Sequence, residues 1–249
     1  MRKIKEKTLL LGGSGNLGSS LIRSKFFTDL KYPTKKILNI LSKRKIEKYL
    51  LDNDIKIVIH CAGMARVREC EKFKSRAFKT NVLGTANIAE SIKKISKKYN
   101  KKIKLVYISS DAVYPSTKGN YKESDKLKHY NYYGFTKIKG EKIVKNLKDY
   151  IIIRTRFFNK KKIKFKFSAV NLYNSGLEVS QVSNYIYKLL KKKFKGIINI
   201  GGKKVSDYKK YKKFKSNLKP CDKSKILSDL NFKIAIDASM NISKLRKIL

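Results

Sequence analysis

Three side chains in the middle of the chain have the types and spacing needed for acid-base chemistry on an oxygen atom of a substrate. Ser110 ends an apolar run, and Tyr133 and Lys137 lie four residues apart further along. A helix would place the tyrosine and the lysine on one face, where an ammonium group stabilises phenolate and lowers the tyrosine pKa from its ordinary value of about 10. A serine at a neighbouring strand end would hydrogen-bond the same substrate oxygen. These three residues form our candidate catalytic group.

The spacing of the tyrosine and the lysine carries little weight by itself, because lysine is so common in this chain. Of the 249 residues, 62 are lysine or arginine, and the chain contains six tyrosines with a lysine four residues later. Only Tyr133 follows an apolar run that ends in serines and opens a segment with the length of a helix. The position of the pair therefore selects it, and its spacing does not.

A second group with a chemical use is the glycine-rich stretch TLLLGGSGNLGSSLI at residues 8–22. Residues 8–11 predict a short buried strand and residues 16–27 have the apolar spacing of a helix, so the glycines fall at a strand-to-helix turn. Backbone amides at such a turn bind a pyrophosphate, because glycine has no Cβ and the helix start favours negative charge. A tight connector without a ligand is the alternative. Two fingerprints overlap here, G-x-G-x-x-G from Gly13 and G-x-x-G-x-x-G from Gly12.

The segment after the glycines favours a phosphorylated dinucleotide. Sites for NAD usually place an acidic residue about 20 residues after the glycines, where it accepts a hydrogen bond from the ribose 2′-hydroxyl. No acid lies between Asp29 and Glu47, whereas Lys35 and Lys36 fall in this interval. Lysines there would bind a 2′-phosphate, so we predict NADP as the cofactor, with NADPH favoured over NADH.

Alternating strand-like and helix-like segments must position these groups. The apolar runs with the length of strands are residues 8–11, 55–62, 104–110, 150–158 and 196–202. Helical patterns separate them, most clearly at 73–99 and 132–146. The alternation predicts an α/β fold, a Rossmann-like doubly wound parallel sheet with helices on both faces. Such sheets bind ligands beyond the carboxyl ends of their strands, where the glycine turn would lie.

The regular alternation stops after residue 158, where the basic segment KKKIKFKF begins. We therefore predict an NAD(P)-binding Rossmann domain over residues 1–158 and a small C-terminal substrate lobe over residues 159–249. The lobe would be partly interleaved with the sheet, because we expect the strand at 196–202 to return to it. No internal repeat or long flexible linker interrupts the chain.

The formal net charge of +44 has two interpretations. One is an electrostatic footprint for nucleic acid or an anionic membrane, and the other is a solvated lysine surface. The lysines are spread along the whole chain, and only nine residues are arginine, the type suited to bidentate contacts with phosphates and bases. We therefore expect only weak, non-specific binding of polyanions.

Cysteine usage and hydropathy indicate the cellular compartment of the protein. Cys61, Cys70 and Cys221 are odd in number and form no C-x-x-C pair, which is typical of reduced thiols and not of a disulfide frame or a zinc site. No apolar run approaches the roughly 18 residues of a membrane span, and the run near the N-terminus is too short for a signal peptide. We predict a cytoplasmic protein without a metal site or a membrane span.

Taken together, the motifs resemble those of the extended short-chain dehydrogenase/reductases, and within that group those of the dTDP-4-dehydrorhamnose reductase family of nucleotide-sugar reductases. The matching pieces occur in the family order over most of the chain: GGSGNLG at 12–18, IVIHCAG at 57–63, VRECE at 67–71, NVLGTANIAE at 81–90, SSDAVY at 109–114, YKESD at 121–125, YGFTKIKGE at 133–141, IIIRT at 151–155 and GIINIGG at 196–202. The resemblance implies that the fingerprint starting at Gly12 binds the dinucleotide. The residues that would contact it are Gly12, Gly15, Asn16, Leu17 and Gly18.

The resemblance also implies catalytic and substrate roles, residue by residue. Tyr133 would donate a proton to a carbonyl oxygen as nicotinamide delivers hydride, Lys137 would bind the ribose and tune the tyrosine, and Ser110 would orient the carbonyl. Asp111 would contact the substrate, because the Ser-Asp pair resembles the Thr-Asp of the family. Glu123 is a second substrate candidate, for which an ordinary loop acid is the alternative.

Further cofactor contacts follow from the same resemblance. They are Cys61, Ala62 and Gly63 at the end of the third strand, Leu38 and Asn39 near the adenine, and Asn81 near the lysine. Asn39 replaces the aspartate of the family. For Asn81, satisfying backbone groups is the alternative, and His60 is more typical of a packed core residue than of a catalyst.

The resulting hypothesis is an NAD(P)H-dependent reductase of a nucleotide-diphosphate 4-keto-sugar, acting in deoxysugar and surface polysaccharide biosynthesis, with a homodimer as a further expectation. A nucleotide-sugar epimerase or dehydratase that holds NAD tightly and a non-catalytic dinucleotide-binding subunit are the alternatives. The chain is shorter than typical members of the family, after the second strand and in the substrate lobe. Residues 159–178 show no recognisable sugar-nucleotide contacts, so the substrate rests on the resemblance alone.

Overall fold

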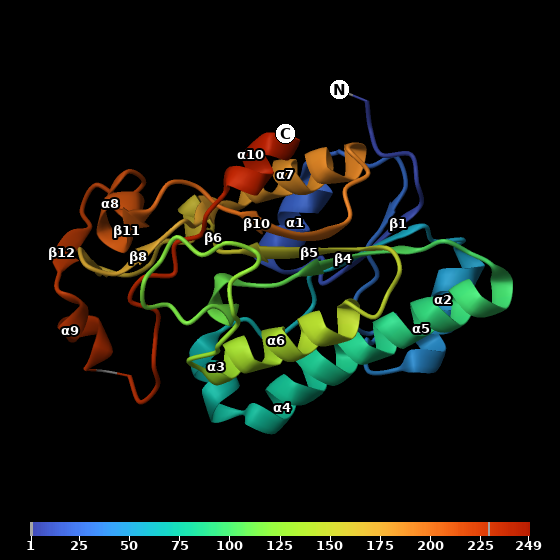
Figure 1. The fold of residues 1–249 in the computed structure, drawn as a ribbon, viewed down its shortest axis with the longest axis horizontal. Coiled ribbons are helices and arrows are strands. Elements are labelled where there is room, and N and C mark those ends of the chain that lie inside the picture. The colour runs from blue at the N-terminus through green and yellow to red at the C-terminus, as the bar shows by residue number, and fades with distance from the viewer. Residues whose placement is uncertain (1, 229) are drawn as a thin grey trace.

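A parallel sheet runs through the centre of the molecule in the computed structural model, which describes residues 2–228 and 230–249 (Figure 1). Among these residues the sheet has six strands in the order β10-β5-β4-β3-β1-β2. The strands are β1 (Thr8–Leu11), β2 (Leu30–Lys31), β3 (Ile57–His60), β4 (Lys104–Ile108), β5 (Tyr150–Thr155) and β10 (Gly196–Ile200). The chain runs outward from β1 to β2 and then returns to β3 on the other side of β1. The carboxyl ends of β1 and β3 therefore mark the switch point at which such sheets bind ligands.

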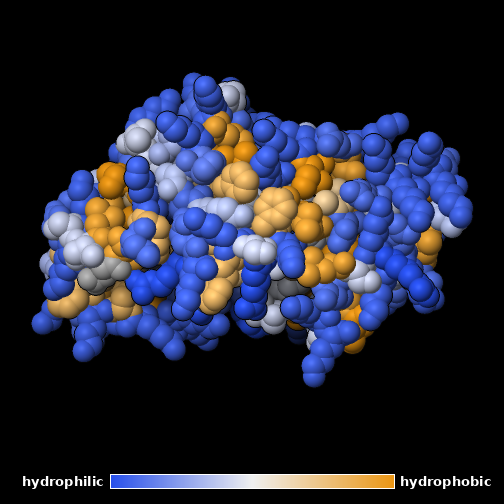
Figure 2. Space-filling model, turned by 90° about the horizontal axis from the view of Figure 1, so that it is seen from below, coloured by the Kyte–Doolittle hydropathy of each residue, from blue (hydrophilic) through white to orange (hydrophobic). Residues whose placement is uncertain are grey.

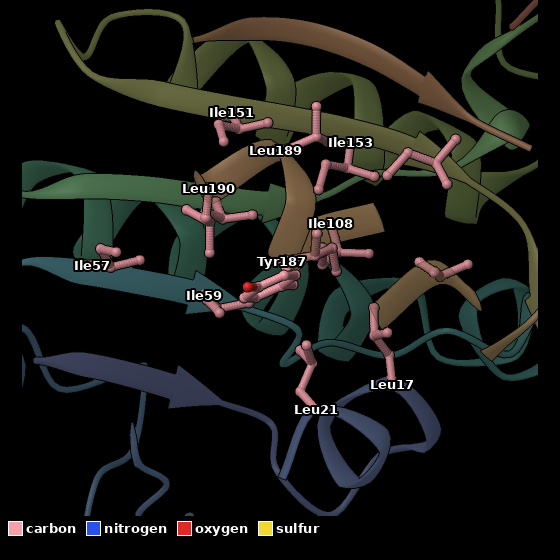
Figure 3. Packing of buried hydrophobic residues seen from close by; sticks show 14 of the residues in the cluster. Leu17, Leu21, Ile57, Ile59, Ile108, Ile151, Ile153, Tyr187, Leu189 and Leu190 are labelled. Carbon is pink, nitrogen blue, oxygen red and sulfur yellow. The ribbon is translucent and has the colours of Figure 1, made fainter. Parts of the chain in front are cut away.

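Helices cover both faces of the sheet, because successive side chains of each buried strand point to opposite faces. On one face, Leu10, Ile59 and Val106 belong to an apolar cluster with α1 (Asn16–Arg23), α7 (Val179–Lys191) and α10 (Ser243–Ile248). Figure 3 shows side chains of α1 and α7 gathered against those of β3, β4 and β5 in this cluster. On the other face, a second cluster joins the strands to α2 (Lys43–Asp52), α5 (Gly84–Tyr99) and α6 (Tyr132–Val144). The predicted fold class is confirmed.

Two expected helices differ from the structure in their length. The helix expected over residues 16–27 ends at Arg23, because Lys25 takes a positive φ of 54° and turns the chain so that Phe27 reaches the core. The helix expected over residues 73–99 is divided. It comprises α4 (Lys74–Phe78), the π-helical turn η1 (Lys79–Leu83) and α5, and α3 (Val67–Lys72) precedes it.

The run expected over residues 150–158 is also divided, because the chain leaves the sheet after β5 and β6 pairs elsewhere. Among the described residues outside the central sheet, six short strands form the pairs β6-β9, β7-β12 and β8-β11. Their bounds are β6 (Phe157–Phe158), β7 (Phe167–Ala169), β8 (Tyr173–Asn174), β9 (Leu177–Glu178), β11 (Val205–Ser206) and β12 (Lys219–Cys221). With α8 (Asp207–Lys212) and α9 (Lys223–Leu227), most of them gather at one end of the molecule (Figure 1).

Much of residues 159–249 lies with the central sheet. β10 pairs in parallel with β5, so that Ile198 is opposite Ile153, and α7 packs on α1. Short 3-10 turns complete the chain at η2 (Asp111–Val113) and η3 (Lys160–Lys162). Within the described part of the chain, no helix is both long enough and apolar enough to cross a bilayer.

Candidate active site and cofactor cleft

A cleft of about 590 Å³ opens at the carboxyl ends of β1 and β3. Its walls come from the glycine turn, from the segment between β2 and α2, from the loop after β3 and from α4. The predicted cofactor residues that line it are Gly12, Gly15, Lys35, Leu38, Asn39, Cys61, Ala62 and Gly63. Other predicted residues do not line this cleft. They are Asn16, Leu17, Gly18, Lys36, Asn81, Tyr133 and Lys137.

Steric constraints in the glycine turn require glycine at positions 12 and 18. Gly12 has a φ of +88°, and a Cβ there would lie 2.6 Å from the backbone nitrogen of Ala62. A Cβ on Gly18 would collide with the carbonyl oxygen of Gly12, whereas one on Gly13 would meet only side-chain atoms. The close packing of β1, β3 and α1 therefore requires the glycines of the fingerprint that starts at Gly12 and does not require Gly13. Leu17, between these glycines, packs its side chain into the core.

The candidate catalytic residues meet at the carboxyl edge of β4. Ser110 follows this strand, and Tyr133 and Lys137 lie on α6, whose start is capped by Asn131 through its side-chain bond to the Gly134 amide. A Cβ on Gly134 would collide with the carbonyl oxygen of Ala112, so glycine lets the first turn of α6 approach the loop after β4. Tyr133 lies beside Ser110 as a result.

A buried ion pair fixes the other end of this helix. Glu141 of α6 accepts hydrogen bonds from Arg154 of β5, with Nη2 to Oε2 at 2.7 Å, and from Ser109 at 2.6 Å. All three side chains are buried. Because breaking such a pair would leave an uncompensated buried charge, the contact holds α6 against β4 and β5.

Burial sets the protonation of Tyr133 and Lys137. Burial raises the pKa of Tyr133 well above its ordinary value, although the Ser110 hydroxyl beside it and the charge of Arg156 oppose the rise. Burial lowers the pKa of Lys137 to about 8. The expectation that Lys137 would lower the tyrosine pKa below 10 is wrong, because burial outweighs the other influences on Tyr133. The lysine Nζ instead lies over the ring of Tyr107, 4.2 Å from its centroid.

The two predicted substrate residues have different surroundings. Asp111 is buried beside Ser110, and its Oδ1 accepts a hydrogen bond from the Ser110 hydroxyl at 3.1 Å. Glu123 accepts from the Asn199 amide of β10 at 2.9 Å, and its carbonyl oxygen accepts from Arg154. The structure thus brings Asp111 into the catalytic group, whereas the carboxylate of Glu123 ties its own loop to the sheet.

Asn81 links the cofactor cleft to the catalytic helix. It lies in the π-helical turn η1, where its Oδ1 accepts from the Met64 amide at 2.7 Å. Its Nδ2 donates to the Met64 carbonyl oxygen and to Thr136 of α6. Asn81 therefore satisfies backbone groups of the loop after β3, as the alternative interpretation held, and does so one residue from Lys137. Single π-helical turns are frequent at functional sites.

Burial keeps other polar residues near the cleft in their neutral forms. His60 bonds through Nε2 to the Thr85 hydroxyl at 3.0 Å, and burial lowers its pKa to about 3, so the ring stays neutral. Burial raises the pKa of the Cys61 thiol to about 12 and that of Cys70 to about 11. Among the described residues, no three His, Cys, Asp or Glu side chains gather as metal ligands.

Arg156 and Tyr130 are site residues that the sequence analysis missed. Arg156 directly follows β5, and its Nε lies 2.5 Å from Oδ2 of Asp111. Tyr130 lies close to Arg156 and to Ser116. The signal for Arg156 was a charged residue at the carboxyl end of the strand next to β4, within the otherwise apolar run YIIIRTRFF.

A doubly wound sheet with a glycine turn at its switch point, and with a serine, a tyrosine and a lysine at its carboxyl edge, defines a Rossmann-type protein of the extended short-chain dehydrogenase/reductase class. The model of the RmlD substrate binding domain family matches residues 6–185, and the chain belongs to this family.

Relatives of known sequence match part of the chain. It is 32% identical over 154 residues to the spore coat polysaccharide biosynthesis protein SpsK of Bacillus subtilis (strain 168), covering 60% of this chain and 52% of that protein. It is 32% identical over 107 residues to the methionine adenosyltransferase 2 subunit beta of Bos taurus, covering 43% of this chain and 30% of that one. The chain thus spans about half or less of the length of these relatives.

Solved structures match nearly the whole chain. The dTDP-4-dehydrorhamnose reductase of Bacillus anthracis in complex with NADP superimposes with a TM-score of 0.85 at 24% identity, covering 98% of this chain and 93% of that one. A hypothetical dTDP-4-dehydrorhamnose reductase of Sulfolobus tokodaii gives a TM-score of 0.81 at 28% identity, covering 98% and 94%. The fold of the chain is therefore that of these reductases.

Proposed function

We propose that the protein is an NADPH-dependent reductase of a nucleotide-diphosphate 4-keto-sugar, in deoxysugar and surface polysaccharide biosynthesis. The observation that carries the proposal is the meeting of Ser110 and Tyr133, with Lys137 one helical turn further on, at the carboxyl edge of a sheet whose switch point holds a glycine turn. Membership of the RmlD substrate binding domain family and the folds of the similar reductases support it.

The residues of the cleft fit a nicotinamide dinucleotide. Gly12 lets the turn pack closely against the backbone of Ala62, and the amides of the glycine turn supply donors for a pyrophosphate. Leu38 and Asn39 line the part of the cleft expected to hold adenine. The bound dinucleotide would supply the hydride that the reduction requires.

The preference for NADPH rests on the charge of the cleft walls. Lys35 and Arg76 both line the cleft, and no acidic residue is among its described lining residues. A neighbouring hollow shares Lys35, Leu41, Arg76 and Thr80 with the cleft but none of the glycine turn, so the two cations lie at the end remote from that turn. The adenosine, with its 2′-phosphate, would occupy this end. Arg76 comes from α4, where the sequence analysis did not look for a phosphate ligand.

The chain's own groups can protonate a carbonyl oxygen. Because burial raises the pKa of Tyr133, its phenol keeps its proton at neutral pH and can donate it to the substrate. Ser110 lies beside this phenol, and Lys137 would bind the ribose hydroxyls. A hollow of about 630 Å³, lined by Tyr130, by residues 115–117 and by side chains between residues 227 and 236, would receive the rest of the nucleotide-sugar.

Replacing Tyr133 by phenylalanine tests the proposal. Removing the proton donor should lower reduction of the correct keto-sugar by at least about a hundredfold, because a general acid typically contributes 10²–10⁴-fold. The assay follows NADPH oxidation with a panel of nucleotide 4-keto-sugars. Tyr132→Phe is the matched control, since it removes a neighbouring hydroxyl and should retain activity. Native rates in the Tyr133→Phe variant, with cofactor binding intact, would refute the assignment.

The same assay separates the alternatives. A nucleotide-sugar epimerase or dehydratase would interconvert its substrate without net consumption of added NADPH. A non-catalytic subunit, which the similarity to methionine adenosyltransferase 2 subunit beta brings into consideration, would bind the dinucleotide without turnover. A homodimer and a cytoplasmic location are further parts of the proposal, which sedimentation of the purified protein and cell fractionation would test.

A further inference from the structure

Arg156 enters the site from the strand beside the one that carries Ser110. β4 and β5 are parallel neighbours in which Ile108 lies opposite Ile153, so the residues that follow the two strands meet at one edge. The side chain of Arg156 is one-third exposed, whereas that of Asp111 is almost completely buried. The arginine therefore lies at the surface of the site with its partner carboxylate beneath it.

A chain of hydrogen bonds connects Arg156 to Ser110, whose hydroxyl lies beside the phenol of Tyr133. The Arg156 Nε donates to Oδ2 of Asp111 at 2.5 Å, and Oδ1 of Asp111 accepts from the Ser110 hydroxyl at 3.1 Å. A carboxylate has no proton to donate, so the single hydroxyl proton of Ser110 points to Asp111. The Ser110 oxygen also accepts from the Ala112 amide at 3.2 Å, and the phenol of Tyr133 lies beside it. With the Ser110 proton directed to Asp111, the phenol of Tyr133 is the group that can donate a proton to a substrate oxygen.

Charged groups of the smaller lobe face Arg156 from the other side. Asp207 of α8 faces its guanidinium, and Asp207 is itself bonded to Lys210 and Asn174, each at 2.8 Å. Tyr130 packs against the guanidinium as well. Tyr133 faces Ser110, Asp111, Cys70 and Arg156, so the arginine is the positive charge among these neighbours.

We propose that Arg156 is a positioning residue of the active site, which holds Asp111 in place and through it directs the hydroxyl of Ser110 so that Tyr133 acts as the proton donor. This inference rests on the proposed reductase function for its effect on turnover. Removal of the arginine leaves Asp111 free to turn and places its unbalanced negative charge near Tyr133. The phenol then becomes a weaker acid, and proton donation slows.

Steady-state kinetics of Arg156→Met provide the first test. The value of kcat should fall by about tenfold to a hundredfold, within the range that general acid catalysis contributes, while the Kd of NADPH stays within about twofold. Arg156→Lys should restore part of kcat, because an ammonium can make one bond to Asp111. Arg66→Met, which removes an arginine from the exposed pair with Glu69, is the matched control and should behave as the native protein. An unchanged kcat, or a loss of cofactor affinity equal to that of kcat, would overturn the proposal.

Titration of Tyr133 provides a second test that needs no substrate. Replacing Tyr133 by 3,5-difluorotyrosine lowers the phenol pKa into a measurable range and permits fluorine NMR across a pH series. The titration midpoint should move upward in Arg156→Met and downward in Asp111→Asn, because the two variants remove opposite charges near the phenol. It should not move in Arg66→Met. Equal midpoints in all four proteins would refute the coupling. If the midpoint moves upward in Arg156→Met and downward in Asp111→Asn but the protein reduces no keto-sugar, the coupling between Arg156 and Tyr133 stands. The proposed reductase function would then be refuted.

Discussion

Lys137 occupies a position where its charge reduces stability. Its side chain is 8% exposed, and burial lowers its pKa to about 8 from the 10.5 expected of an unfolded chain. Between these two pH values the unfolded chain binds the lysine proton more strongly than the folded protein does. The free energy of unfolding contributed by this group therefore rises with pH across the window from 8 to 10.5, and the full cost of burying the ammonium applies below pH 8.

The Lys137→Met variant separates stability from activity. It should be more stable than the native protein at pH 7 by about 1–3 kcal/mol, because the buried charge is removed and most of the side-chain volume is kept. It should also lose most reductase activity, since the ammonium that we propose binds the ribose is gone. Thermal unfolding and NADPH oxidation measure the two effects. Lys139→Met, on the exposed side of the same helix, is the control, and lower stability in Lys137→Met than in this control would contradict the argument.

The pH dependence of activity in the native protein tests the protonation of Lys137 as well. Reductase kcat/KM should decline above about pH 8, because the Lys137 ammonium is then lost. Tyr133 does not account for such a decline, since burial keeps the pKa of its phenol well above that range.

At the scale of elements, the cofactor cleft depends on segments that lie far apart in the sequence. The link between β2 and α2 brings Lys35 to the cleft wall, and α4 brings Arg76 to the same end. Lys36 is exposed and does not line the cleft, so the two neighbouring lysines have different surroundings.

Binding measurements on Lys35 and Arg76 variants test the cofactor preference. Lys35→Ala and Arg76→Ala should each weaken NADPH by about tenfold and NADH by less than about twofold, because each removes one charge-assisted contact with the 2′-phosphate. The Lys35→Ala/Lys36→Ala protein should likewise lose NADPH more than NADH. Calorimetry with adenosine 2′,5′-diphosphate and adenosine 5′-monophosphate isolates the phosphate. Arg68→Ala, which changes an arginine that does not line the cleft, is the control. Equal losses for both nucleotides would indicate general charge and no phosphate site.

At the scale of the whole molecule, the excess of positive charge dominates the surface. Figure 2 shows hydrophilic side chains over most of one face, with apolar patches between them. With 62 basic and 18 acidic residues, the net charge is +44. Anionic ligands should be attracted to such a surface, and the attraction should weaken as salt shortens the screening length to about 8 Å near 0.15 M.

Two salt titrations would test the attraction of anionic ligands to this positively charged surface. Association of NADPH should slow as ionic strength rises, which stopped-flow fluorescence would measure. Filter binding with several unrelated RNA and DNA sequences should show weak retention at low salt that disappears at moderate salt, because dispersed lysines make few simultaneous phosphate contacts. Sequence-selective binding that survives physiological salt would contradict this account and would make nucleic acid a true partner.

Local patterns along the chain were enough to predict most of the central strands and the candidate catalytic residues. Apolar runs of strand length predicted β1, β3, β4, β5 and β10, and the glycine turn and the tyrosine-lysine pair followed from spacing and position. The positions at which strands end did not follow from these patterns, as residues 150–158 show. There Phe157 and Phe158 continue the apolar run but pair with β9, since pairing depends on distant segments.

Which side chains meet, and which protons they hold, depends on how distant elements pack together. Arg156 joins Asp111 across 45 positions of sequence, and Arg76 reaches the cleft wall beside Lys35. Neither contact leaves a local pattern, because each depends on the order of strands in the sheet and on the path of the loops. The pKa of Tyr133 shows the same limit. The local pair with Lys137 predicted a lowered pKa, whereas burial, which is set by every element packed around α6, raises it.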